Sequence, residues 1–270
     1  MTNLKKRVLF VSSEMSPFLE PSALADVARL LPQALQERDN EIRILVPRFG
    51  VINERRNRLH EVVRLSGINI SIDDNDNPLI IKVASIPQTK MQVYFLDNED
   101  YFHRKAIYND DDGKFFEDND ERTIFFCKGV LETVKKLGWA PDIIHCQGWM
   151  TSLIPMYLKT IYADEPVFRN SKVVYSVYKE EDVQYLGKDF ARKASLNELD
   201  EAAVACFSDA TVANLHRGAI QHADAVVTGC EEAHQAISDI LHEKPVLRHC
   251  EDEYGDKYVT FYEQLMSQSN

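Results

Sequence analysis

The first fifty residues alternate between short apolar runs and apolar residues at helical spacing. The run from Val8 to Val11 is typical of a buried parallel strand, and Ile42 to Val46 predicts a second one. Between them, apolar residues from Leu24 to Leu35 recur at the spacing that places them on one face of a helix. The pattern therefore predicts a βαβ unit, with its binding loop after the first strand.

The same alternation of strands and helices continues to about residue 241. A long amphipathic helix is expected from Asp118-Asn119 to Gly138, where glycine is suited to end it. Alternating strands and helices of this kind predict an α/β fold with a doubly wound parallel sheet. The further predicted strands are 142–145, 172–177 and 225–228, and the further predicted helices are 150–161, 214–223, 231–241 and a terminal helix within 256–266.

The segment from Gly67 to Leu96 has a strand pattern instead. Strands are expected at 68–72, 79–86 and 91–96, with a turn over Asp73–Pro78, so a hairpin is predicted beside the parallel core. This acidic turn and Asp110–Gly113 are the two segments rich enough in carboxylates to suggest a calcium site. The second run lacks the carboxylate spacing of a calcium loop, so we expect solvated loops and no metal site.

Size and charge narrow the possible partners. A chain of 270 residues with 44% hydrophobic composition can bury one substantial core. Its formal net charge of −12 would be repelled by nucleic acid and by an anionic membrane surface. Neutral polysaccharides and protein surfaces remain as candidate partners.

The cysteines and the N-terminus indicate the cellular compartment. The chain has 5 cysteines, an odd number, and none are in C-x-x-C spacing. This usage predicts reduced thiols in the cytoplasm and no zinc site. The apolar run ending at Val11 is too short for a signal or membrane segment. No Walker motif or G-x-S-x-G occurs, so we expect no cofactor and no independent hydrolase.

The loop after the first strand carries a family resemblance. SSEMSPFLEPSALADV, at residues 12–27, resembles the SSEMxPFxKTGGLADV motif of bacterial glycogen synthases and plant starch synthases. The resemblance implies that the lysine and the glycine pair hold the diphosphate of ADP-glucose. Here Glu20 replaces the lysine, and Ser22 and Ala23 replace the glycines. Because Glu20 repels phosphate and the glycines gave close backbone approach, we expect diphosphate binding to be weakened by several kcal/mol.

The resemblance extends over roughly residues 7 to 241. APDIIHCQGWMTSLIPMYLKT is similar to the family's PDIIHxHDWHTALVPxYLK, and ANLHRGAIQHADAVVTGC is similar to NFLKGGIxxADxVxTVS. The resemblance implies the first lobe of a two-lobed GT-B glycosyltransferase, a single Rossmann-like lobe, with most of the donor site on a second lobe. We assign residues 1–245 to this lobe and residues 246–270 to a closing helix that packs back on it.

The expected catalytic position is altered as well. The second histidine of the family's HxHDWH motif, which the resemblance places against the transferred glucose, is Gln147 here. Glutamine cannot carry a charge or relay a proton, so no catalytic residue is predicted. Two other strand ends also depart from the family pattern: TIHN is replaced by residues 176–179 and TVSP by residues 228–231.

The resemblance leaves a set of candidate substrate-binding residues. The candidates are Asp26, Asp118, Asn119, Arg122, His145 and Trp149. Each also has a structural alternative: helix capping and surface pairing for the first four, a core histidine with both nitrogens hydrogen-bonded for His145, and packing for Trp149.

Three functions follow from these observations. The preferred one is a glycogen or starch synthase-like lobe that is not catalytic alone and serves as a glucan-binding or regulatory module. The second is a weak or split ADP-glucose:α-1,4-glucan glucosyltransferase completed by a separate polypeptide. The third is a non-enzymatic protein-interaction module. Aromatic residues expected to be exposed for sugar or protein contact are Tyr101, Phe102, Phe115 and Phe116, with inward packing as an equal alternative for the last two.

Overall fold

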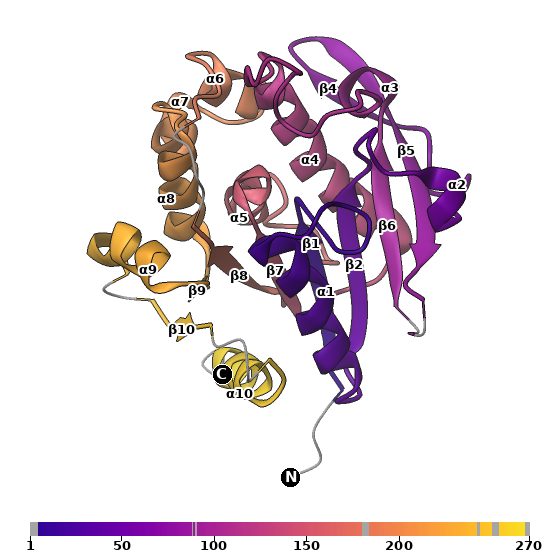
Figure 1. The fold of residues 1–270 in the computed structure, drawn as a ribbon. Coiled ribbons are helices and arrows are strands. Elements are labelled where there is room, and N and C mark those ends of the chain that lie inside the picture. Colours follow the sequence, from indigo (N-terminus) through magenta and orange to yellow (C-terminus); the bar gives the residue numbers. More distant parts are fainter. Residues whose placement is uncertain are drawn as a thin grey trace.

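A ten-stranded, mostly parallel sheet forms the centre of the protein, which is described by a computed structural model (Figure 1). The strand order is β10-β9-β8-β7-β1-β2-β6-β5-β3, with β4 paired to β5. The parallel strands are β1 Arg7–Ser12, β2 Glu41–Pro47, β6 Gln92–Asp97, β7 Ile143–Gln147, β8 Lys172–Val177, β9 Ala225–Thr228 and β10 Val246–Arg248. The structure describes residues 5–87, 89, 91–179, 184–241, 244–249 and 254–267.

The central strands are buried on both faces. In β1 the residues from Val8 to Val11 are all 0% exposed, as the continuous apolar run predicts for a parallel strand. Alternate residues of a strand point to opposite faces. On β7, His145 faces one helix layer, where it bonds Tyr262, whereas its neighbour Cys146 lies near Cys127 in the other layer. The predicted doubly wound α/β fold is confirmed.

One face of the sheet carries the first and last helices, and the opposite face carries the longer intervening ones (Figure 1). The ion pair between Arg38 and Asp256, at 2.6 Å, joins the two helices of the first layer. The predicted packing of the terminal helix on the lobe is therefore observed. The first layer is α1 Ala23–Gln36 and α10 Asp256–Ser267; the main helices of the second are α4 Asn119–Leu137, α5 Leu153–Lys159 and α8 Val212–His222.

Several helix boundaries differ from the sequence-based expectation. Gly138 ends α4 with a φ of 61°, as predicted. Helix α8 begins two residues early because the side chain of Thr211 caps it. The predicted helix at 150–161 is a 3-10 turn at Trp149–Thr151 followed by α5. The remaining short elements are α2 Glu54–Asn57, α3 Glu99–Phe102, α6 Phe190–Ala194, α7 Glu201–Val204, α9 Glu231–Ile237 and the 3-10 turns Ala205–Phe207 and Ser238–Ile240.

The predicted hairpin is present, but its turn is tighter. Strand β4 (Ile68–Ile72) meets β5 (Asn75–Ser85) through only Asp73 and Asp74, which have φ of 47° and 62°. Two left-handed residues are what a two-residue hairpin turn requires, and aspartate tolerates this conformation. The expectation of a turn reaching Pro78 is therefore wrong, because Pro78 pairs with Asn69 inside the sheet.

Two strands were not expected from the sequence. The two-residue β3 (His60–Glu61) pairs antiparallel with β5, and β10 extends the sheet beyond β9. Both are too short to give a periodic signal. Strand β10 and α10 both lie in the segment that we assigned as a closing unit, and that division at residue 245 stays a prediction.

Candidate functional site

A cleft lies where the carboxyl ends of β1, β7 and β8 meet the loops that follow them. This is the expected ligand position in an open parallel sheet. Its volume of about 710 Å³ is within the usual range for small-ligand sites. We call it the strand-end cleft, and its lining is Ser13, Glu14, Pro21, Ser22, Ala23, Leu24, Tyr108, Asn109, Phe115, Trp149, Tyr178, Lys179, Gln184 and Val212.

A carboxylate lies beside the N-terminus of α1 in this cleft. The Ser22 hydroxyl accepts a 3.0 Å bond from the backbone N–H of Ala25 and donates a 2.8 Å bond to Glu14 Oε2. The Tyr108 hydroxyl donates to Glu14 Oε1 at 3.3 Å. A negative charge is stabilised at a helix N-terminus. The residue that replaces a glycine of the family motif thus fastens the protein's own carboxylate where an anionic ligand would approach.

Aromatic side chains form another wall of the cleft. Trp149 is 6% exposed, and its ring centroid lies 5.1 Å from that of Tyr108 and 5.9 Å from that of Phe115. Trp149 therefore packs in a cluster and also lines the cleft, so both functions considered for it are compatible with its position. Tyr101 and Phe102 are buried, and the expectation that they are exposed is wrong.

Three of the predicted substrate-binding residues lie behind Tyr108. Asn119 Nδ2 donates to the Tyr108 carbonyl at 2.9 Å, and Arg122 Nη1 donates to Asn119 Oδ1 at 2.5 Å. Asn119 and Arg122 are both 0% exposed, and burial lowers the pKa of Arg122 to about 10. Asp118 pairs with Arg104. None of the three lines the cleft. Asn119 and Arg122 are buried and hold the loop that carries Tyr108, which is neither helix capping nor surface pairing, whereas the partly exposed pair of Asp118 with Arg104 fits the surface-pairing alternative.

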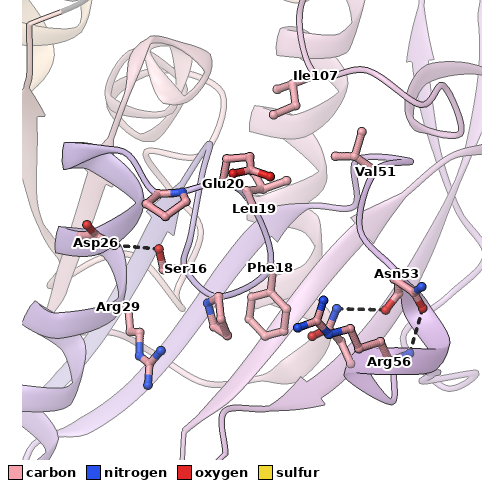
Figure 2. Close-up of a pocket in the computed structure, with 13 residues that line it drawn as sticks. Ser16, Phe18, Leu19, Glu20, Asp26, Arg29, Val51, Asn53, Arg56 and Ile107 are labelled. Atoms are coloured by element: carbon pink, nitrogen blue, oxygen red, sulfur yellow. Dashed lines mark hydrogen bonds between the residues drawn. The ribbon is translucent and has the colours of Figure 1, made fainter.

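Asp26 and Glu20 line a second pocket, on the other side of the loop after β1 (Figure 2). The Ser16 hydroxyl donates a 2.8 Å bond to Asp26 Oδ1. Asp26 lies in the first turn of α1 and lines this pocket, not the strand-end cleft; the cap of the helix is Ser22, so the capping alternative for Asp26 is not observed. We call this space of about 670 Å³ the Glu20 pocket; it is lined by residues 16–21, Asp26, Arg29, Val51, Asn53, Arg56, Asn57 and Ile107.

His145 and Gln147 are both fully buried on β7. His145 Nδ1 lies 2.6 Å from the Tyr262 hydroxyl and Nε2 lies 2.5 Å from the Ser176 hydroxyl, so both ring nitrogens are satisfied. Burial, aided by His249, lowers the pKa of His145 to about 3. A neutral histidine with both nitrogens bonded fits the structural alternative, and no atom of it reaches the cleft.

Sequence reasoning missed the residues that contribute most to the cleft wall. Glu14 belongs to the recognised motif but was not assigned a role, and Tyr178 was noted only as a departure from TIHN. Tyr178 is 7% exposed and lines the cleft. The available signal was its position directly after a buried strand, because side chains there face the ligand edge of the sheet.

Comparison with known proteins identifies the family. The family described as "Starch synthase catalytic domain" matches residues 7–244. The chain belongs to this starch synthase family. It is 42% identical over 236 residues to the glycogen synthase of Chlorobaculum tepidum, covering 86% of this chain and 48% of that protein. It is 40% identical over 229 residues to the glycogen synthase of Pelodictyon phaeoclathratiforme, covering 84% of this chain and 46% of that protein.

The fold comparison agrees with the family. The catalytic domain of starch synthase IV from Arabidopsis thaliana, bound to ADP and acarbose, superposes with a TM-score of 0.73 at 20% identity. The match covers 90% of this chain and 51% of that one. The fold is therefore that of a GT-B glycosyltransferase lobe. The chain spans about half the length of the curated relatives it matches.

The described residues were predicted from the sequence to have no membrane segment, reduced cysteines and no metal site. Within the described part of the chain, no helix is long and apolar enough to cross a membrane. Cys127, Cys146, Cys206 and Cys230 are free thiols there, and burial raises the pKa of Cys127 to about 12. No cluster of three potential metal ligands occurs among these residues.

Proposed function

We propose that this member of the starch synthase family acts in cytoplasmic polysaccharide metabolism as a glucan-binding or regulatory lobe that does not transfer glucose by itself. The observation that carries the proposal is the Ser22 hydroxyl, at a position where the family motif has glycine: it caps α1 and holds the carboxylate of Glu14, a residue shared with the family, at that helix end. A diphosphate at that helix end would face this carboxylate. Two like charges about 4 Å apart repel by about 4 kcal/mol at a protein surface, before screening by salt.

The charges around the cleft support weak nucleotide binding. Lys179 is exposed at the rim of the cleft, but it interacts electrostatically with the carboxylate of Glu232, which offsets part of its positive charge. Glu20, at the position of the family's phosphate lysine, lines the other pocket. With Gln147 at the histidine position, no imidazole is available there to stabilise a departing glycosyl group.

The chemistry of the cleft supports an uncharged polyhydroxyl ligand. The Ser13 hydroxyl is buried and lines the cleft, and within the described residues it has no hydrogen-bond partner. A buried polar group without a partner is costly, and a ligand hydroxyl would satisfy it. The carboxylate of Glu14 accepts hydrogen bonds, and the rings of Trp149 and Phe115 offer apolar surface. Carboxylate, hydroxyl and aromatic groups together suit a sugar chain better than a phosphate.

Enzymatic and binding assays together test the proposal. Purified protein incubated with ADP-glucose and glycogen is expected to release no ADP above background, with the Chlorobaculum tepidum glycogen synthase as positive control. The same protein is expected to bind glycogen in a sedimentation assay. Sustained ADP release that Trp149→Ala abolishes would contradict the non-catalytic part, and failure to sediment with glycogen would contradict the glucan-binding part.

A split glucosyltransferase is the second candidate, because the chain matches the starch synthase catalytic family and has a cleft of ligand size at its strand ends. In that case a separate polypeptide supplies a nucleotide-binding lobe and transfer requires both. Affinity purification from the native cell tests this. ADP-glucose-dependent elongation of glycogen by the purified complex, and not by either component, would support it; recovery of the chain without such a partner would count against it.

A further inference from the structure

The ring of Tyr178 packs against Gly229, and this contact requires a residue without a side chain at position 229. The ring lies against the backbone of Gly229, in the loop after β9, and a Cβ built on Gly229 would overlap ring carbons of Tyr178. Any larger residue at position 229 would force this ring to move. Tyr178 as a whole is 7% exposed and is one of the residues that line the strand-end cleft. The absence of a side chain at Gly229 therefore leaves room for the ring in the position where Tyr178 lines the cleft.

The phenol group is held from behind by a chain of buried polar groups. Gln147 Nε2 donates to the Tyr178 hydroxyl at 3.5 Å, and the Ser176 side chain also hydrogen-bonds it. Ser176 is itself fixed by His145 at 2.5 Å. Anchoring at the hydroxyl and support beneath the ring leave little rotational freedom. An immobilised ring loses little entropy when a ligand binds to it.

Gln147, Tyr178 and Gly229 are also three positions at which the sequence departs from the strand-end motifs of its family. They occupy the ends of three adjacent strands, and they contact one another through the phenol oxygen and the ring. A cleft that had only lost function would not need a glycine matched to a tyrosine. The fit indicates that these three residues form one rebuilt surface.

We propose that Tyr178 determines the ligand specificity of the strand-end cleft by presenting its ring to one pyranose unit of an α-glucan, a role that rests on the glucan binding proposed above. The polarised C–H groups of a pyranose face are attracted to the negative face of an aromatic ring. Ser13 and Glu14, in the same lining, accept or share hydrogen bonds with the sugar hydroxyls. The adenine ring of a nucleoside would gain the stacking but offers these groups only its one amino group as a donor, whereas a pyranose offers several hydroxyls.

Isothermal titration with maltoheptaose, on the full chain, tests the role of Tyr178. Tyr178→Ala is expected to weaken binding at least 10-fold, and Gly229→Ala to weaken it similarly by displacing the ring. Tyr178→Phe, which keeps the ring, is expected to stay within about threefold of wild type. Tyr185→Ala removes a 51% exposed tyrosine outside the cleft lining and should bind as wild type does. Gly218→Ala, which overlaps Phe207 away from the cleft, controls for overpacking alone.

The outcomes separate the two proposals. If wild type binds maltoheptaose and a folded Tyr178→Ala binds equally well, the assignment of Tyr178 is overturned while glucan binding stands. If wild type binds adenosine more tightly than maltoheptaose, the sugar specificity is overturned. If wild type binds no glucan, both proposals fail. Should the alanine variants not fold, NMR of wild-type protein labelled at the tyrosine rings decides: maltoheptaose must shift the Tyr178 ring signals, and unchanged signals at saturation would overturn the assignment.

Discussion

His145 and Gln147 lie two residues apart on β7 and on the same face of the sheet, yet their surroundings differ. Both ring nitrogens of His145 have partners, from α10 and from β8. Gln147 makes one long bond to Tyr178, and its buried Oε1 has no hydrogen-bond partner within the described residues. The comparison separates a position that holds the fold together from one that has been rebuilt next to a ligand cleft, although burial is the same at both.

The largest expected effect is on stability at the His145 position. His145→Leu removes two buried hydrogen bonds and leaves the hydroxyls of Tyr262 and Ser176 without this partner, so unfolding should become easier by about 3–5 kcal/mol. Gln147→Leu should change the free energy of unfolding by about 1 kcal/mol or less, because the hydroxyl of Tyr178 keeps its bond to Ser176. Urea denaturation measures both. Equal costs at the two positions would break the comparison.

A pH dependence of stability should follow from the same histidine. Below about pH 6.5 the unfolded chain binds a proton at His145, while the folded chain does not until about pH 3. The unfolded state therefore holds more protons in this window, and stability falls as pH falls, by about 1.4 kcal/mol per unit at most. Between pH 6.5 and 4.5 the loss is about 2 kcal/mol.

Denaturation at pH 7 and 4.5 checks this contribution. His145→Gln cannot take up the proton, so its loss of stability over the interval should be smaller than that of wild type by about 2–3 kcal/mol. His60→Gln replaces an exposed histidine on the edge strand and should behave as wild type. If the two variants have the same pH dependence, the buried, neutral state of His145 is refuted.

The affinity for ADP tests whether the substituted loop residues weaken nucleotide binding in the strand-end cleft. Two substitutions restore the family residues. Ser22→Gly removes the hydroxyl that holds Glu14, and Glu20→Lys reverses a charge in the loop. We expect ADP to bind about 10-fold more tightly, equivalent to about 1.4 kcal/mol. A thermal-shift titration with ADP measures it. Glu37→Lys makes the same charge change at the far end of α1, and an equal gain there would mean that net charge alone is responsible.

The smallest effect is expected at Asp26. Asp26→Ala removes a favourable charge from the first turn of α1 and the bond from Ser16, which should cost about 0.5–1 kcal/mol of stability. Maltoheptaose affinity should stay within about twofold, because Asp26 faces the Glu20 pocket. Titration of the folded variant measures this affinity. A 10-fold loss would place the glucan site in the Glu20 pocket and not in the strand-end cleft.

The sequence alone determined the sheet and most of its helices. Runs such as Val8–Val11 and Val173–Tyr175 are apolar because parallel strands are covered on both faces, and this signal is local. The glycine that ends α4 and the family resemblance could also be predicted from the sequence. The two-residue hairpin turn and β10 were not, since pairing with a neighbouring strand decides them more than composition does.

Only the tertiary structure decided which candidate residues face a ligand. Asn119 and Arg122 are predicted substrate-binding residues but lie behind Tyr108, and Asp26 faces a different pocket from Trp149. The fit of Tyr178 on Gly229 joins residues 51 positions apart, since 229 minus 178 is 51. No local pattern encodes such a contact, because it depends on how β8 and β9 are paired and on what each side chain meets across the sheet edge.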